Sequence, residues 1–92
     1  MNRSRIQVCY SGSVHGVGFR YTVKSLAPGF EVTGTIRNLP AGQVELVLEG
    51  SQAELEAFQQ AVRDLGVGRL IQREQTGWSE ARGEFCGFEI VR

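Results

Sequence analysis

The sequence predicts an α+β fold in which two helices cover one face of a mainly antiparallel five-stranded sheet. Two segments space their apolar residues as helices do, and the segments around them alternate apolar and polar residues as half-buried strands do. Their order along the chain is strand, helix, strand, strand, helix, strand, strand, which is the order of the split βαβ fold. The 92 residues are enough for one core, so we expect a single domain over residues 1–92.

The first half of the chain is expected to contain a strand, a short helix and a hairpin. Apolar residues recur at i, i+4, i+7 and i+8 from Phe19 to Ala27, which predicts one helix that ends at Pro28-Gly29. The segment from Asn38 to Gly42 is rich in turn-forming residues and joins two alternating segments into a hairpin. These elements are expected over residues 5–10, 19–27, 30–37 and 44–49.

The second half begins with a sequence typical of a helix start. Ser51 and Glu54 have the spacing of a capping box, in which each side chain accepts a hydrogen bond from the other residue's backbone N–H. The apolar stripe of the helix that follows runs to Leu65, and Gly66 ends it. A polar strand over 70–76, typical of a sheet edge, and a last strand over 85–91 complete the fold.

A glycine-rich segment from Gly12 to Arg20, here named the glycine loop, joins the first strand to the first helix. Its glycines can adopt positive φ and let an anion approach the backbone, and a strand–turn–helix unit directs several N–H groups to one point. Arg20 adds a planar set of donors that matches a phosphoryl group. From the residues alone, an oxyanion site and a simple tight turn explain this segment equally well.

Better-known phosphate-site motifs do not fit the glycine loop. A Walker A loop ends in Gly-Lys-Ser/Thr, whereas this segment ends in Phe19-Arg20-Tyr21. Gly16 and Gly18 are only two of the three glycines that a dinucleotide-binding fingerprint requires. The chain also lacks a Cys-x5-Arg phosphatase loop and an acidic cluster suited to two metal ions, so a covalent or metal-assisted mechanism has little support in the sequence.

Two segments of the sequence resemble the signature motifs of the acylphosphatase family. They are Gly12-Ser13-Val14-His15-Gly16-Val17-Gly18-Phe19-Arg20 and Gly34-Thr35-Ile36-Arg37-Asn38-Leu39-Pro40-Ala41-Gly42-Gln43-Val44. The resemblance extends over nearly the whole chain and implies a ferredoxin-like fold with the sheet order 4-1-3-2-5. One position departs from the family pattern, because Thr35 stands where an aromatic residue is usual. This departure bears on packing or on substrate fit nearby.

The resemblance also implies an activity, the hydrolysis of acyl phosphates to a carboxylate and phosphate without a metal or another cofactor. Arg20 would bind the phosphoryl oxygens, and Asn38 would hydrogen-bond the attacking water. Without the resemblance, the start of a hairpin turn would be the better explanation of Asn38. The side chain of His15 is interpreted as ordering the loop rather than as a general base. Backbone N–H groups complete the implied phosphate site, namely those of His15, Gly16, Val17, Gly18, Phe19 and Arg20.

The composition argues against several other classes of protein. Ten basic and ten acidic residues give a formal charge of zero, which argues against a nucleic acid or a membrane as the main partner. No apolar run suits a membrane span or a signal peptide, so we expect a cytoplasmic protein, and a monomer. Cys9 and Cys86 lack metal-ligand spacing and are expected to be reduced thiols in strands.

The main alternative function is a non-catalytic module of the same fold that binds a phosphate or another anion for regulation. An RNA-binding sheet is disfavoured, because the central strand Gln43 to Glu49 has no aromatic residue for base stacking and carries two acids. Outside the implied site, Trp78 is interpreted as a packing or edge residue, and Glu45, Glu49 and Glu54 as solvated side chains.

Overall fold

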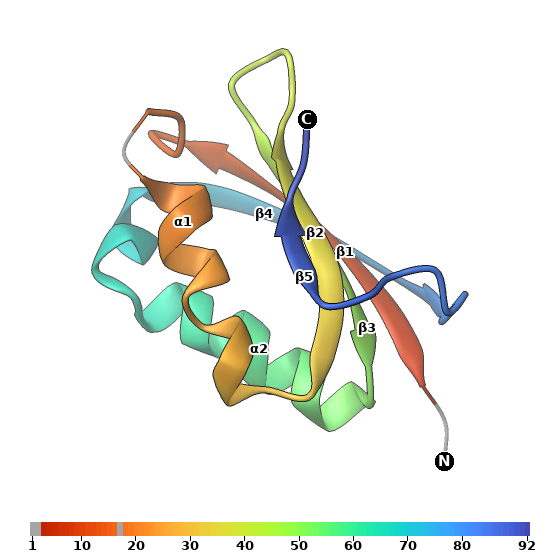
Figure 1. Cartoon of the computed structure of the whole chain (residues 1–92). Coiled ribbons are helices and arrows are strands. Elements are labelled where there is room, and N and C mark those ends of the chain that lie inside the picture. Colours follow the sequence, from red (N-terminus) through yellow and green to blue (C-terminus); the bar gives the residue numbers. More distant parts are fainter. Residues whose placement is uncertain (1–2, 17) are drawn as a thin grey trace.

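The computed structural model describes residues 3–16 and 18–92 and places two helices on one face of a five-stranded sheet (Figure 1). The strand order is β4-β1-β3-β2-β5, and the described strand pairs are antiparallel except β2 with β5. The fold class and the sheet order expected from the sequence are therefore confirmed. The elements are β1 (Ser4–Gly12), α1 (Phe19–Lys24), β2 (Val32–Asn38), β3 (Val44–Gly50), α2 (Gln52–Asp64), β4 (Ile71–Glu80) and β5 (Phe88–Ile90).

The alternating strand pattern gives the sheet one apolar face, and both helices pack against it (Figure 1). Polar residues that alternate with the core positions, such as Arg5, Gln7 and Glu45, point to the opposite face, which neither α1 nor α2 covers. We name it the helix-free face. The fully buried side chains of the core include Ile6, Val8, Ile36, Leu46, Leu48, Leu55, Phe58 and Val62.

The first helix is shorter than the sequence predicts. α1 ends at Lys24, and Ala27–Gly29 forms a separate 3₁₀ turn instead of continuing the helix. Pro28 explains the break, because proline has no N–H to donate and disfavours a helical backbone at the residue before it. Leu26 and Ala27 still pack against the core, which is why they continue the apolar pattern of the helix.

The last two strands also differ from the prediction. β4 extends to Glu80 rather than 76, because β1 pairs with it along nearly its whole length. β5 has only three residues rather than the predicted 85–91, and residues 81–87 instead cross the helix-free face (Figure 1). Gly83 and Gly87 have left-handed backbone, with φ of 68° and 75°, which a regular strand does not contain.

Half of the predicted capping box forms at the start of α2. The Oγ of Ser51 accepts a hydrogen bond from the N–H of Glu54 at 3.3 Å. The carboxylate of Glu54 accepts one at 2.7 Å from the N–H of Glu31 rather than from Ser51. Glu54 is therefore half-buried, and it links the start of α2 to the segment before β2.

Tyr10 is a polar side chain inside the core. It is fully buried, and its ring packs edge-on against Phe19 with the ring centroids 5.5 Å apart. Its hydroxyl oxygen makes no hydrogen bond with any residue that the structure describes. Burial, and to a smaller extent the charge of Glu74, raises the pKa of the Tyr10 hydroxyl above its ordinary value.

Tyr10→Phe is expected to stabilise the fold by about 1 kcal/mol, because it removes an unpaired buried hydroxyl and keeps the ring. The gain should grow above about pH 10, where the tyrosine of the unfolded chain ionises and the buried one resists ionisation. The raised pKa means that the wild-type stability is complete below this pH and falls as the pH rises further. Urea unfolding of both proteins at about pH 7 and about pH 11 measures the difference. A variant less stable than the wild type at both pH values would contradict this account.

Candidate active site

The glycine loop and the end of β2 lie at one rim of the sheet (Figure 1). Tyr10 of β1 is opposite Val44 of β3, which is opposite Asn38 of β2, so these residues form a row across three adjacent strands. Neighbouring strands lie about 4.8 Å apart, which places Asn38 roughly 10 Å from Tyr10. Because the glycine loop begins two residues after Tyr10, the fold brings the two predicted segments to the same rim.

A bulge at Gly12 turns the chain out of β1. The pairing with β4 shifts between Ser11 and Gly12, and the N–H of Ser13 donates to the carbonyl of Leu70 at 3.1 Å. Gly12 has φ 128°, and a Cβ atom there would lie 2.4 Å from the carbonyl oxygen of Leu70. Glycine is therefore required at this position, and it sets the direction in which the loop leaves the sheet.

Gly18 starts α1 with a left-handed backbone of φ 75°, and no side chain caps the helix. A Cβ atom added to Gly18, or to Gly16 before it, would meet no atom within 4 Å, so the space beside this backbone is open. The first N–H groups of a helix have no partner within the helix, which leaves those of Phe19 and Arg20 free to bind an anion. Val17, also predicted to contribute its N–H, lies outside the described residues.

Arg20 is the second residue of α1 and is half-buried. The contact between Phe19 and Tyr10 holds the start of this helix over the row that ends in Asn38. Among the residues that the structure describes, no carboxylate forms an ion pair with the guanidinium of Arg20. A cation at a helix start opposes the helix dipole, so this arrangement favours an anion beside Arg20.

Asn38 is the last residue of β2, and its Oδ1 is buried without a hydrogen bond from any described residue. The hairpin is closed instead by the backbone, through the N–H of Leu39 and the carbonyl of Gln43 at 2.7 Å. An asparagine that starts a turn normally accepts a nearby backbone N–H with its side chain. The turn therefore does not explain Asn38, whose oxygen is an unused acceptor at the rim.

Two side-chain contacts join the β2–β3 hairpin to the glycine loop and to the end of β1. Nε2 of His15 lies 3.1 Å from the carbonyl oxygen of Gln43, and Nε2 of Gln43 donates to Oγ of Ser11 at 3.2 Å. These contacts fit the interpretation of His15 as a residue that orders the loop. The contact between Ser11 and Gln43 was not predicted, because the two residues are 32 positions apart and no sequence pattern links them.

Thr35 lies on the helix-free face. It is opposite Val47 of β3 and Glu89 of β5, and since side chains alternate along a strand, it points away from the face that Asn38 shares with the helices. The departure from the aromatic residue usual in the acylphosphatase family therefore bears on packing of the helix-free face rather than on the rim.

The structure also bears on the expectations for metal ligands, the two cysteines and membrane helices. Within residues 3–16 and 18–92, no group of three or more His, Cys, Asp or Glu side chains is arranged to hold a metal ion. Cys9 and Cys86 are both free, but Cys86 is exposed in the segment before β5 rather than in a strand. In the same part of the chain, no helix is both long and apolar enough to cross a membrane.

Comparison with known proteins places this arrangement in a family. Residues 6–90 match the sequence profile described as Acylphosphatase. The acylphosphatase of Methanospirillum hungatei is 40% identical over 86 residues, 94% of this chain and 91% of that protein. The acylphosphatase of Pelotomaculum thermopropionicum is 37% identical over 91 residues, 99% of each. The crystal structure of the Bacillus subtilis acylphosphatase has a TM-score of 0.87 at 28% identity, covering 97% of this chain and 99% of that one.

The profile covers nearly the whole chain, the relatives exceed 30% identity, and the solved structure shares the fold. The chain therefore belongs to the acylphosphatase family of enzymes.

Proposed function

We propose that this protein hydrolyses acyl phosphates at the rim formed by the glycine loop and the end of β2. The substrate is a small carboxyl-phosphate mixed anhydride, and the products are a carboxylate and inorganic phosphate. Membership of the acylphosphatase family and the shared fold support this reaction. The proposal treats residues 1–92 as one catalytic domain, a cytoplasmic monomer that acts without a metal or another cofactor.

In the proposed complex, the phosphoryl group binds at the start of α1. Arg20 donates to its oxygens, and the backbone N–H groups from His15 to Arg20 complete the site. The uncapped helix start and the absence of a paired carboxylate beside Arg20, within the part of the chain that the structure describes, support this placement. These donors neutralise charge that builds up on the phosphoryl oxygens during the reaction.

Asn38 orients the attacking water. Its buried, unused Oδ1 accepts a hydrogen bond from the water, which directs a lone pair of the water oxygen toward phosphorus. A bond forms between the water oxygen and phosphorus while the bond from phosphorus to the acyl oxygen breaks, and the carboxylate leaves with that electron pair. The proton of the water passes to a phosphoryl oxygen of the substrate, since the Nε2 of His15 already contacts the carbonyl of Gln43. The unused acceptor of Asn38 is the observation on which the proposal chiefly depends.

Hydrolysis of benzoyl phosphate by the wild-type protein, in excess chelator, tests the proposal. We expect turnover that chelation does not reduce, because the protein itself supplies the charge that stabilises the phosphoryl group. p-Nitrophenyl phosphate is the matched substrate control and should react far more slowly, since it is a monoester rather than an activated anhydride. A folded protein that binds inorganic phosphate but hydrolyses neither compound would favour the non-catalytic binding module instead.

A further inference from the structure

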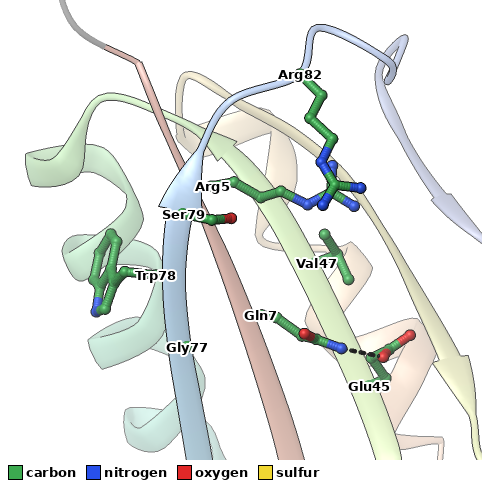
Figure 2. A pocket seen from close by; sticks show the side chains of 8 residues that line it. All are labelled: Arg5, Gln7, Glu45, Val47, Gly77, Trp78, Ser79 and Arg82. Carbon is green, nitrogen blue, oxygen red and sulfur yellow. Dashed lines mark hydrogen bonds between the residues drawn. The ribbon is translucent and has the colours of Figure 1, made fainter.

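A pocket of about 450 Å³ opens on the helix-free face, over β4, β1 and β3 (Figure 2). The strand register builds its floor in two rows. Arg5 lies opposite Glu49 and Ser79, and in the next row Gln7 lies opposite Val47 and Gly77. The segment 81–87 forms one wall through Arg82, whereas the side chain of Trp78 points away from the pocket (Figure 2).

Gly77 keeps this pocket open. A Cβ atom at Gly77 would meet no atom within 4 Å, so a larger residue would fit the strand and project into the space over the floor. A second, smaller pocket continues from Gln7 and Gly77 toward Cys9 and Gln75. The two form one groove along β1 and β4, and the missing side chain of Gly77 lies at its centre.

Two arginines, Arg5 and Arg82, line one end of the pocket and are joined through Glu49. Oε2 of Glu49 accepts a hydrogen bond from Nη1 of Arg5 at 2.9 Å and another from the backbone N–H of Arg82 at 2.8 Å. Nη1 of Arg5 also donates to Glu84, and its guanidinium lies 4.9 Å from the ring centroid of Phe85. The side chain of Arg82 lines the same pocket as that of Arg5 (Figure 2).

The two arginines and the two glutamates at this end, Glu49 and Glu84, balance in formal charge, but not every N–H donor is used. Arg5 is held by Glu49 and Glu84, but its remaining N–H groups donate to no acceptor among the described residues. The guanidinium of Arg82 forms no ion pair with any carboxylate of the described chain. Two planar sets of donors with free N–H groups, lining one pocket, match the oxygens of a carboxylate or a phosphate.

The other end of the pocket contains the ion pair of Glu45 and Arg37. The carboxylate of Glu45 lies there, hydrogen-bonded to Gln7 and, at 2.8 Å, to Nε of Arg37 (Figure 2). Gln7 is two residues from Arg5 along β1, which separates the two ends by about 7 Å. In a ligand with a negative group at each end, the second group would lie beside the carboxylate of Glu45 and be repelled. The pocket therefore suits a ligand with a single negative group.

We propose that this pocket binds a small organic anion with a single negative group. A carboxylate or phosphate oxygen accepts hydrogen bonds from Arg82 and from the free N–H groups of Arg5. The uncharged body of the ligand lies over Gly77 and beside Val47. The site lies on the face of the sheet that carries no helix, so it is separate from the rim and does not depend on the proposed hydrolysis.

Amide NMR of the ¹⁵N-labelled protein tests the site with benzoate, phenyl phosphate and terephthalate as probes, at constant ionic strength. We expect benzoate to shift the amides of Gly77, Ser79 and Arg82 saturably, at millimolar concentrations. Terephthalate, which has a charge at each end, should bind at least about tenfold more weakly. Tighter binding of phenyl phosphate than of benzoate would assign the oxyanion to a phosphate rather than a carboxylate.

Three variants make the test specific. Arg82→Ala should weaken benzoate binding by about tenfold or more, because it removes the guanidinium that has no carboxylate partner within the described chain. The variant keeps the hydrogen bond from the backbone N–H of residue 82 to Glu49. Gly77→Val should abolish binding by filling the pocket. Arg73→Ala is the matched control, since it removes one charge from the same strand outside the pocket and should leave binding unchanged. Shifts that do not saturate, or that survive in both Arg82→Ala and Gly77→Val, would overturn the proposal.

Discussion

Asn38→Ala is expected to lower kcat for benzoyl phosphate by about 10²–10³-fold, roughly 3–4 kcal/mol of transition-state stabilisation. The substitution removes the amide that is proposed to orient the water and leaves the backbone bond between Leu39 and Gln43 that closes the hairpin. Binding of inorganic phosphate should be unchanged, because Asn38 is not proposed to contact the phosphoryl group. Steady-state kinetics with phosphate as a competitive inhibitor measures both quantities in one experiment.

Arg20→Ala provides the contrast to Asn38→Ala. It should abolish phosphate binding and activity together, because Arg20 is proposed to donate to the phosphoryl oxygens. Lys24→Ala is the matched control, since it removes an exposed cation one turn further along α1 and should change neither quantity. If Asn38→Ala and Arg20→Ala weakened phosphate binding equally, the proposed division of roles between the two residues would be wrong.

Glu49→Gln is expected to reduce the free energy of unfolding by about 3 kcal/mol. The carboxylate of Glu49 is fully buried and accepts hydrogen bonds from Arg5 and from the N–H groups of Arg82 and Gly83. Glutamine has nearly the same shape but carries no charge, so it leaves the guanidinium of Arg5 without its buried partner. In a chain of this size the loss corresponds to a fall in Tm of about 12 °C or more, which thermal unfolding measures.

The pH dependence and a second variant separate this effect from a general surface effect. Burial alone would raise the pKa of the Glu49 carboxyl, but the N–H of Arg82, the guanidinium of Arg5 and the N–H of Gly83 together hold that pKa below its ordinary value. In the wild type, the stabilisation from Glu49 is therefore present above about pH 4.5 and is lost as the pH falls below this value. Glu49→Gln has no carboxyl to titrate at this position and should not show this loss. Glu84→Gln removes the exposed partner of Arg5 and should cost no more than about 1 kcal/mol. Equal losses in the two variants would contradict the role given to burial.

Local patterns in the sequence were sufficient for much of the fold and for the candidate site. Apolar periodicity located both helices and the hairpin, because side chains on one face of an element share one environment. The glycine loop and Asn38 lie in short, distinctive segments, so their neighbouring positions in the structure followed from the expected sheet order. The predicted end of the first helix was less accurate, because Leu26 keeps the apolar spacing of a helix although α1 ends at Lys24.

The burial of Glu49 could not be predicted from local sequence patterns. A glutamate that alternates with apolar residues in a strand is expected to be solvated, and Glu49 is instead fully buried. Its partners Arg5, Arg82 and Gly83 are 44, 33 and 34 positions away. The burial arises because residues 81–87 cross the sheet above it, and the sequence had predicted a strand for part of that segment. The pocket beside Arg82 depends on the same crossing and was missed for the same reason.

The bulge at Gly12 has a consequence for the order of events during protein synthesis. The glycine loop leaves the sheet beside the carbonyl of Leu70, and β1 pairs with β3 and β4, both of which are translated much later. β1 is translated before both of these partners, so the glycine loop cannot take its final shape until β4 has emerged from the ribosome. Such long-range pairing is slow compared with helix or hairpin formation. We expect nascent chains that lack β4 to be inactive, although they already contain the glycine loop, Arg20 and Asn38.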